Sequence, residues 1–295
     1  MNEELEVDGE SDSESAWETL GHVPPDGLPD DRLQLHHAVQ LLSAFGQTYL
    51  EVRPDDRHRS MSWDSRQRSF STDPTPEGLW LVLRVPDLAV SLMGSGDEHL
   101  VLSFGGRTLE EAREWLEIAV AEVLGSERRA LGRREYEVPE HPVGEQTPFG
   151  PTPEGLLELS RWYSDASRLL SELRDETPGT SEIRVWPHHF DIGAVIAVAP
   201  ARGGSDARTV GVGLSPGDGM SGEPYFYVNI WPRPGADALP EIDGPGRWNT
   251  DGWVGGVLPA SDIVSAGDRA GAQVELARGF LAQRVAALRE LLLNP

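Results

Sequence analysis

The chain of 295 residues is 38% hydrophobic, which is enough for one large domain or two ordinary ones with real cores. It has no cysteine, and all 25 of its basic residues are arginine, so disulfides, thiolate metal sites, cysteine nucleophiles and lysine Schiff bases are excluded. The formal net charge of −24 argues against nucleic acid as a partner. Because the sequence contains no membrane-spanning apolar run and no secretory signal, we expect a soluble cytoplasmic protein with no membrane partner.

The first segment, residues 1–31, is acidic. It holds 11 acidic residues and no arginine, is rich in Ser and Pro, and lacks any hydrophobic periodicity. Such a composition cannot bury enough apolar surface to offset the entropy of ordering. We therefore predict a disordered, solvated tail; the alternative is a docking arm anchored by Trp17.

Residues 32–125 are predicted to form an N-terminal α+β lobe. Its first helix carries Leu35, Val39 and Leu42 on one face, and the same helix sets His36 and Gln40 one turn apart, where they can face one neighbour. Strand-like stretches follow at 59–73, 78–94 and 99–106. A second helix is predicted over 108–125, opening with Thr108 and Glu111 in capping-box spacing and stopping at Gly125.

A Pro/Gly-rich connecting segment, residues 126–155, leads to a C-terminal α+β lobe over residues 156–295. Helical spacing marks its first and last helices, and β-branched or alternating stretches predict strands at 183–198, 209–214 and 225–231, followed by a Trp/Gly-rich loop or strand at 246–258. The order of helix, three or more mostly antiparallel strands and helix thus occurs twice. We predict an α+β fold of two similar lobes, which an internal duplication would explain.

Side-chain alternation along the C-terminal strands predicts a site. If residues 183–198 form one strand, His188 and Phe190 begin an apolar face, while His189 and Asp191 lie on the opposite one. The other predicted strands divide in the same way, with glycines at alternate positions of 209–214. Around this glycine floor we expect four candidate catalytic residues: His189, Asp191, Tyr225 and Tyr227.

Six further residues are candidate ligand-binding groups. Asn229 and Trp231 continue the same strand face, and Asp218 and Glu223 belong to a loop that can reach over it. Trp248 and Trp253 are flanked by glycines, as in a stacking wall for a planar ligand or a sugar. For the acidic residues, local turn bonding is the alternative role, and for the tryptophans it is burial in the core.

The pairing of His189 with Asp191 fits acid–base work, with the carboxylate orienting the imidazole. It also fits a satisfied surface pair, or two ligands of a divalent metal, although a catalytic zinc normally needs three protein ligands. His188 is expected to be a helix-facing or a strand-end histidine and not a ligand. No cofactor is predicted from the sequence. It lacks a phosphate-binding glycine loop, a Gly-x-Ser-x-Gly elbow and a His-Glu-x-x-His motif.

Several blocks, "LHHAVQLLSAFG", "PDDRHRSMSW", "RVWPHHFDIG", "GVGLSPGDG", "EPYFYVNIWP" and "WNTDGWVGGVL", resemble the motif blocks of an uncharacterised bacterial family of unknown function. The resemblance covers most of the chain from about residue 33. It implies that the blocks occur as a set, and it implies no activity.

Three functions remain open at this point. The first is an enzyme that uses His189 and Asp191 for acid–base chemistry on a small polar or aromatic molecule. The second is a noncatalytic protein that binds a ligand or a partner on the same face. The third is a metal-dependent hydrolase with His189 and Asp191 as ligands. Substrate, reaction and oligomeric state are left undetermined by the sequence.

Overall fold

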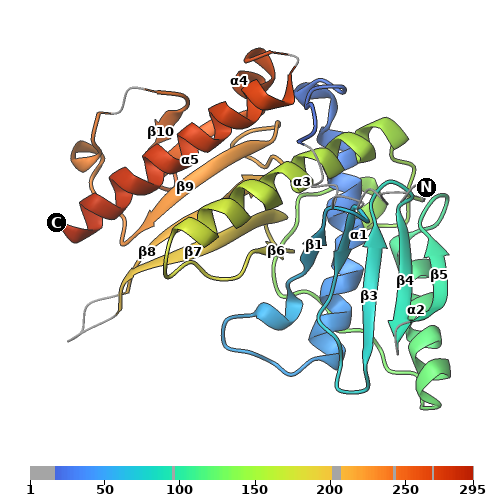
Figure 1. Cartoon of the computed structure of the whole chain (residues 1–295). Helices are drawn as coiled ribbons and strands as arrows, with labels where there is room; N and C mark the ends of the chain where they lie inside the picture. The colour runs from blue at the N-terminus through green and yellow to red at the C-terminus, as the bar shows by residue number, and fades with distance from the viewer. Residues whose placement is uncertain (1–16, 95–96, 201–206, 242–243, 268, 295) are drawn as a thin grey trace, which may run out of the picture.

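Each half of the chain forms an antiparallel sheet covered by helices (Figure 1). The computed structural model describes residues 17–94, 97–200, 207–241, 244–267 and 269–294. The predicted α+β class and the two lobes are confirmed. Whether the lobes arose by duplication stays a prediction.

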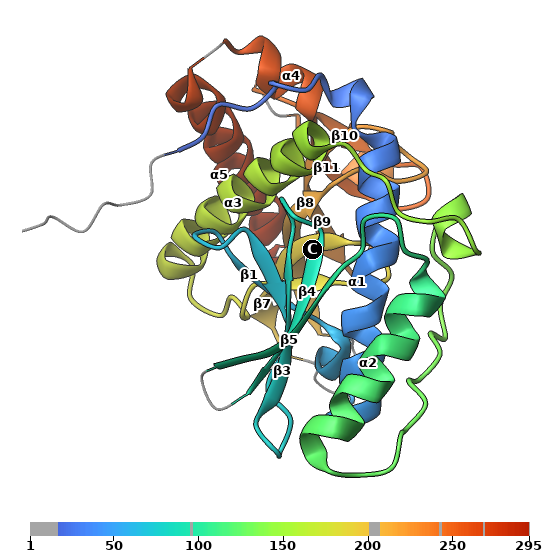
Figure 2. The same cartoon turned by 90° about the vertical axis from the view of Figure 1, so that its right-hand side faces the viewer.

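The N-terminal lobe contains a five-stranded sheet with the strand order β1-β2-β3-β4-β5. Its elements are α1 (Pro29–Tyr49), β1 (Ser62–Asp64), β2 (Ser69–Ser71), β3 (Leu79–Arg84), β4 (Ala89–Gly94), β5 (Asp97–Ser103) and α2 (Leu109–Leu124), with short 3-10 helices η1 (Pro25–Gly27) and η2 (Arg57–Arg59). Helices α1 and α2 lie side by side against this sheet (Figure 2).

The ends of α2 agree with the sequence prediction. The Thr108 hydroxyl accepts from the Glu111 N–H at 3.2 Å, and the Glu111 carboxylate accepts from the Thr108 N–H at 2.8 Å. Gly125 ends the helix with a φ of 60°, a left-handed conformation that glycine adopts without a steric penalty. The capping box and the C-terminal stop are confirmed.

The C-terminal lobe contains a six-stranded sheet with the order β10-β11-β9-β8-β7-β6. Its elements are α3 (Pro153–Glu176), β6 (Arg184–Trp186), β7 (Asp191–Ala199), β8 (Arg208–Ser215), β9 (Tyr225–Trp231), β10 (Arg247–Asn249), β11 (Gly255–Pro259), α4 (Ala260–Ser265) and α5 (Ala270–Leu293), with η3 (Pro142–Gly144) before α3 and η4 (Ala236–Ala238) after β9. Helices α3 and α5 cross one face of the sheet (Figure 1).

The prediction of one strand over 183–198 is wrong. The segment is a hairpin, in which β6 and β7 pair antiparallel across a turn at residues 187–190. Proline has no N–H to donate to a strand ladder, so Pro187 marks the point where β6 stops. The Trp/Gly-rich stretch forms two short strands, β10 and β11.

The predicted apolar face is buried from β7 to β9. Ile192 and Ile196 of β7 lie under the helices, as do Val212 of β8 and both Phe226 and Val228 of β9. These residues belong to one hydrophobic cluster that continues into the N-terminal lobe. The two sheets also meet edge to edge, since an antiparallel bridge joins the residue before β1 to the middle residue of β6. The lobes therefore share one core.

The N-terminal segment corrects the prediction of a disordered tail over residues 1–31. Residues 1–16 lie outside the described residues. From Trp17 on, the chain packs on the helices: Leu20 and Leu28 are buried, and Trp17 contacts the guanidinium groups of Arg168 and Arg278. The alternative of an arm docked through Trp17 fits this part of the chain.

The connecting segment, residues 126–155, does more than link the lobes. It passes beside α1, where the Tyr136 hydroxyl donates to Oε1 of Gln40 at 2.9 Å and lies 3.1 Å from the Ser43 hydroxyl.

No helix within the described part of the chain is long and apolar enough to cross a membrane.

Candidate functional site

The turn between β6 and β7 carries the two adjacent histidines. Trp186 and Asp191 close this hairpin, and residues 187–190 form its loop. Phe190 has a φ of 59°, and its N–H donates to the Trp186 carbonyl oxygen at 2.7 Å. Holding a non-glycine residue in that region costs about 1–2 kcal/mol. Complete burial of the Phe190 ring offsets this cost, since a buried phenylalanine contributes about 1.5–3 kcal/mol.

Helix α1 anchors the start of this turn. The Pro187 carbonyl oxygen accepts hydrogen bonds from Nε2 of His36 and from Nε2 of Gln40, both at 2.9 Å. The prediction that His36 and Gln40 face one neighbour is therefore confirmed. Burial lowers the pKa of His36 to about 4, so the ring is neutral near pH 7 and donates through an Nε2 proton.

Aromatic packing anchors the end of the turn. The Phe190 ring stacks on His36 with 5.0 Å between centroids, and the Tyr163 hydroxyl donates to the Phe190 carbonyl oxygen at 2.5 Å. With the Phe190 ring held in the core, His188 and His189 are left exposed on the opposite side. Of the two positions expected for His188, the helix-facing one is wrong, because the residue lies exposed in the loop that joins the ends of β6 and β7.

A polar layer covers the sheet face opposite α3 and α5, which we call the open face. The Tyr227 side chain lies across the strands β8 and β7, and its hydroxyl donates to Oδ2 of Asp191. A Cβ on Gly193 would lie 2.7 Å from the Tyr227 hydroxyl, and one on Gly213 would lie 2.6 Å from it. The predicted glycine floor thus makes room for a tyrosine of the protein itself.

Two further contacts complete the layer. The Tyr225 hydroxyl donates to Oδ2 of Asp218 at 2.6 Å, while Oδ1 of Asp218 accepts from the N–H groups of Met220 and Ser221 at 2.8 and 3.2 Å. The Trp253 ring meets the Tyr227 ring edge-on, with 6.3 Å between centroids.

Burial controls the protonation of this layer. It raises the pKa of Asp191, an effect that the hydrogen bond from Tyr227 and the nearby imidazoles of His189 and His188 oppose. Burial and the Asp191 charge raise the pKa of Tyr227 well above its usual range, so its hydroxyl stays protonated and serves as a donor. Although His188 as a whole is exposed, the partial burial of its imidazole, followed by repulsion from His189, lowers its pKa. Asp191 therefore keeps its proton to a higher pH than an ordinary carboxyl group.

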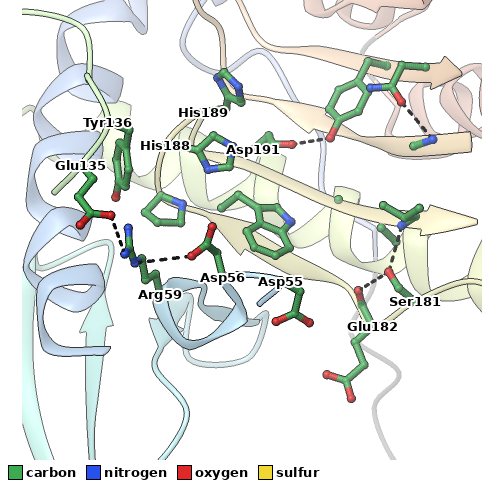
Figure 3. Close-up of a pocket in the computed structure, with 18 residues that line it drawn as sticks. Asp55, Asp56, Arg59, Glu135, Tyr136, Ser181, Glu182, His188, His189 and Asp191 are labelled. Carbon is green, nitrogen blue, oxygen red and sulfur yellow. Dashed lines mark hydrogen bonds and ion pairs between the residues drawn. The ribbon is translucent and has the colours of Figure 1, made fainter. Parts of the chain in front are cut away.

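Three cavities of about 630, 590 and 370 Å³ meet at His189, which lines all of them. We call them the first, second and third cavity. The first lies over the open face, and Figure 3 shows His188 and His189 beside Asp191 in its wall, with Arg59 reaching both Asp56 and Glu135. Neither ring nitrogen of His189 has a hydrogen-bond partner among the residues that the structure describes, so both are available to a ligand.

Seven of the ten predicted site residues line these cavities. The third cavity alone is bordered by His189, Asp191, Asp218, Tyr225, Tyr227, Asn229 and Trp253. The expected orientation of His189 by Asp191 differs from the structure, because Asp191 bonds Tyr227 and acts on the imidazole through charge alone.

The other three predicted residues lie elsewhere. Glu223 accepts from the N–H and hydroxyl of Ser261 at the start of α4, a local capping role. Trp248 lies on the helix side of the sheet, with the Arg284 guanidinium 4.9 Å above its ring. Trp231 is 51% exposed at the end of β9 and lines none of the three cavities.

Sequence reasoning missed several residues that line the cavities, among them Tyr136 and Arg32. Tyr136 lies between the first and second cavities, and Arg32 lines the second. A lone tyrosine within the charged stretch "RREYEVP" is the only local signal for Tyr136. Arg32 lies on the first turn of α1, among polar residues that the sequence does not distinguish from a solvated helix start.

The metal alternative depends on which potential ligand side chains come together. Among the residues that the structure describes, no group of three or more His, Asp or Glu side chains comes together in a way that could hold a metal ion. His189 and Asp191 would have to bind a divalent ion as a pair.

Comparison with protein-family models, with curated proteins and with solved structures found no match. The resemblance to a bacterial family of unknown function stays a prediction.

Proposed function

We propose that the protein is a cytoplasmic enzyme that acts on a small polar or aromatic molecule by acid–base chemistry, with His189 as the group that transfers the proton. The observation that carries this proposal is the position of His189, exposed where three cavities meet and without a hydrogen-bond partner among the described residues. Imidazole is the side chain best suited to exchanging protons near neutral pH.

Asp191 and Tyr227 support His189 from beneath. When the imidazole takes a proton from the substrate, the nearby Asp191 carboxylate stabilises the resulting positive charge. The Tyr227 hydroxyl stabilises the charged form of Asp191 in turn, because it donates to Oδ2. Asn229, Trp253 and Tyr225 belong to the walls that would orient the substrate.

The proposal is tested by metabolite consumption. Purified protein is incubated with a panel of small organic molecules, and their loss is followed by mass spectrometry for wild type, His189→Ala and Asp191→Asn. We expect His189→Ala to slow consumption by about 100-fold or more, the usual contribution of a general acid or base. His99→Ala, an exposed histidine on β5 of the other sheet, is the matched control and should consume at the wild-type rate.

Two outcomes would overturn the proposal. Consumption by His189→Ala at the wild-type rate would remove His189 from the chemistry, and tight binding of a panel compound without any turnover would make the protein a noncatalytic binder. Metal analysis of protein purified without a histidine tag tests the hydrolase alternative. Stoichiometric zinc, iron or manganese that is lost in His189→Ala would replace proton transfer by metal-dependent hydrolysis.

A further inference from the structure

Arg32 is a buried cation with an incomplete set of partners. Its side chain, on the first turn of α1, is only 7% exposed. One of its terminal nitrogens, Nη1, donates to the Gly217 carbonyl oxygen, and its buried Nε has no hydrogen-bond partner. Within the described part of the chain, no carboxylate lies within ion-pair distance of the Arg32 guanidinium.

The nearest acidic group does not neutralise this cation. Asp218 attracts the Arg32 charge, but its oxygens are occupied by the Tyr225 hydroxyl and by the N–H groups of Met220 and Ser221. Burial disfavours the charged guanidinium, and no bonded anion among the described residues offsets this cost. An anionic ligand in the adjoining cavity would supply the missing partner.

The space beside Arg32 can receive that ligand. Arg32 lines the second cavity, of about 590 Å³, together with His189, Trp253 and Tyr136. One wall thus offers a cation, another the proposed proton-transfer group, and two aromatic rings border the space between them. A flat molecule with an anionic end fits this combination, since aromatic rings favour stacking with planar groups.

We propose that the second cavity binds a small aromatic carboxylic acid, with its carboxylate on Arg32 and its reacting part directed toward His189. This inference rests on the proposed function and names the substrate class. A monoanion is favoured over a phosphate dianion because Asp218, Glu137 and Asp251 line the same cavity and repel additional negative charge. A guanidinium matches the two oxygens of a carboxylate in a bidentate geometry.

The test uses benzoate as the probe, with benzamide as its uncharged counterpart and inorganic phosphate as the dianion, titrated into the full chain by calorimetry. We expect wild type to bind benzoate at least tenfold more tightly than benzamide or phosphate. Arg32→Gln should weaken benzoate binding at least tenfold and leave benzamide binding unchanged. Arg66→Gln, an exposed arginine in the β1–β2 turn, is the matched control and should bind benzoate as wild type does.

A second variant keeps the test decisive if Arg32→Gln does not fold. Asp218→Asn removes a negative charge beside Arg32 and should tighten benzoate binding several-fold, with no effect on benzamide. Equal affinity for benzoate and benzamide in wild type, or tighter binding of phosphate than of benzoate, overturns the inference, as does unchanged benzoate affinity in a folded Arg32→Gln variant.

The failure of this inference is distinguishable from the failure of the proposed function. His189→Ala should still bind benzoate in a manner that depends on Arg32, while it loses turnover of panel compounds. Turnover that depends on His189 without benzoate binding at Arg32 overturns the carboxylate inference alone. Benzoate binding that depends on Arg32, without any turnover that depends on His189, overturns the proposed function alone.

Discussion

At the scale of single residues, two glycines without side chains leave room on the open face for the Tyr227 ring. Gly193 and Gly213 are neighbours in the register of β7 and β8, and both lie under Tyr227. A side chain at either position would displace the tyrosine from Asp191. The alternation of glycines in the sequence correctly indicated a close approach to the backbone, but it could not say whether the approaching group belongs to a ligand or to the protein.

Tyr227→Phe tests the pair of Tyr227 and Asp191. Because the lost hydrogen bond favours the charged form of Asp191, its removal should raise the pKa of Asp191 further, as measured by NMR titration of the carboxyl carbon. We expect the variant to lose about 1–3 kcal/mol of stability at pH 8, where the carboxylate is left buried without its donor. The loss should become smaller as the pH falls, because a growing fraction of Asp191 is then protonated and does not need the donor.

Tyr49→Phe is the matched control, because the Tyr49 hydroxyl has no hydrogen-bond partner among the described residues and its removal should change neither quantity. A Tyr227→Phe variant in which the pKa of Asp191 stays constant or falls would contradict the assigned role of the tyrosine.

At the scale of elements, regular patterns were predicted well and the turn was not. Strand β9 runs from Tyr225 to Trp231 as expected, with Phe226 and Val228 buried, because strict alternation over seven residues has one solution with the apolar side in the core. The hairpin at residues 187–190 was missed, since its apolar Phe190 continues the period of β7 by coincidence. His189 reaches the cavity because of the turn.

We call the hydrogen bonds from His36 and Gln40 of α1 to the Pro187 carbonyl oxygen the clasp. Its contribution can be tested with Gln40→Ala. The Gln40 amide nitrogen donates to the carbonyl oxygens of His36 and Pro187, and its oxygen accepts from Tyr136. Loss of these bonds leaves buried polar groups with fewer partners, so we expect a destabilisation of about 1–3 kcal/mol in urea unfolding.

Hydrogen exchange at the Phe190 amide should also accelerate in Gln40→Ala if the clasp positions the turn. Gln47→Ala, on the same helix and without a hydrogen bond to any described residue, should be close to neutral in both measurements. Equal effects of the two substitutions would show that the clasp contributes nothing specific.

At the scale of the whole molecule, the lobes and the N-terminal segment are joined by contacts between residues far apart in sequence. The side-chain amide of Gln273 on α5 bonds both the N–H and the carbonyl oxygen of Leu20, at 2.8 and 3.0 Å. The acidic composition of the first 31 residues predicted a tail, because composition indicates only how well a segment is solvated on average. It carries no information about a partner 253 positions away in the sequence.

Asp165 of α3 accepts a hydrogen bond from the same N-terminal segment. Its shifted pKa predicts that the stability of the fold depends on pH. It is 2% exposed, with Oδ1 accepting from the Glu18 N–H at 3.3 Å and a buried Oδ2 that has no hydrogen-bond partner. Burial raises the pKa of Asp165 from 3.8 to about 7, a shift that Glu18 reinforces and that the Glu18 N–H, Arg168 and Arg68 oppose.

The sign of the effect on stability follows from proton binding. Between pH 4 and pH 7 the folded protein holds a proton on Asp165 that the unfolded chain releases. This group therefore favours folding at low pH, and its contribution to the free energy of unfolding falls as the pH rises, by up to about 1.4 kcal/mol per pH unit.

The side chain of Asp165→Asn cannot ionise. We therefore expect the variant to be more stable than wild type at pH 8 and to show a flatter dependence between pH 5 and pH 7 in denaturant titrations. Asp175→Asn, an exposed position on the same helix, should follow the wild-type curve. Parallel curves for Asp165→Asn and wild type would mean that Asp165 is already ionised in the folded protein, with its charge compensated by Arg168 and Arg68.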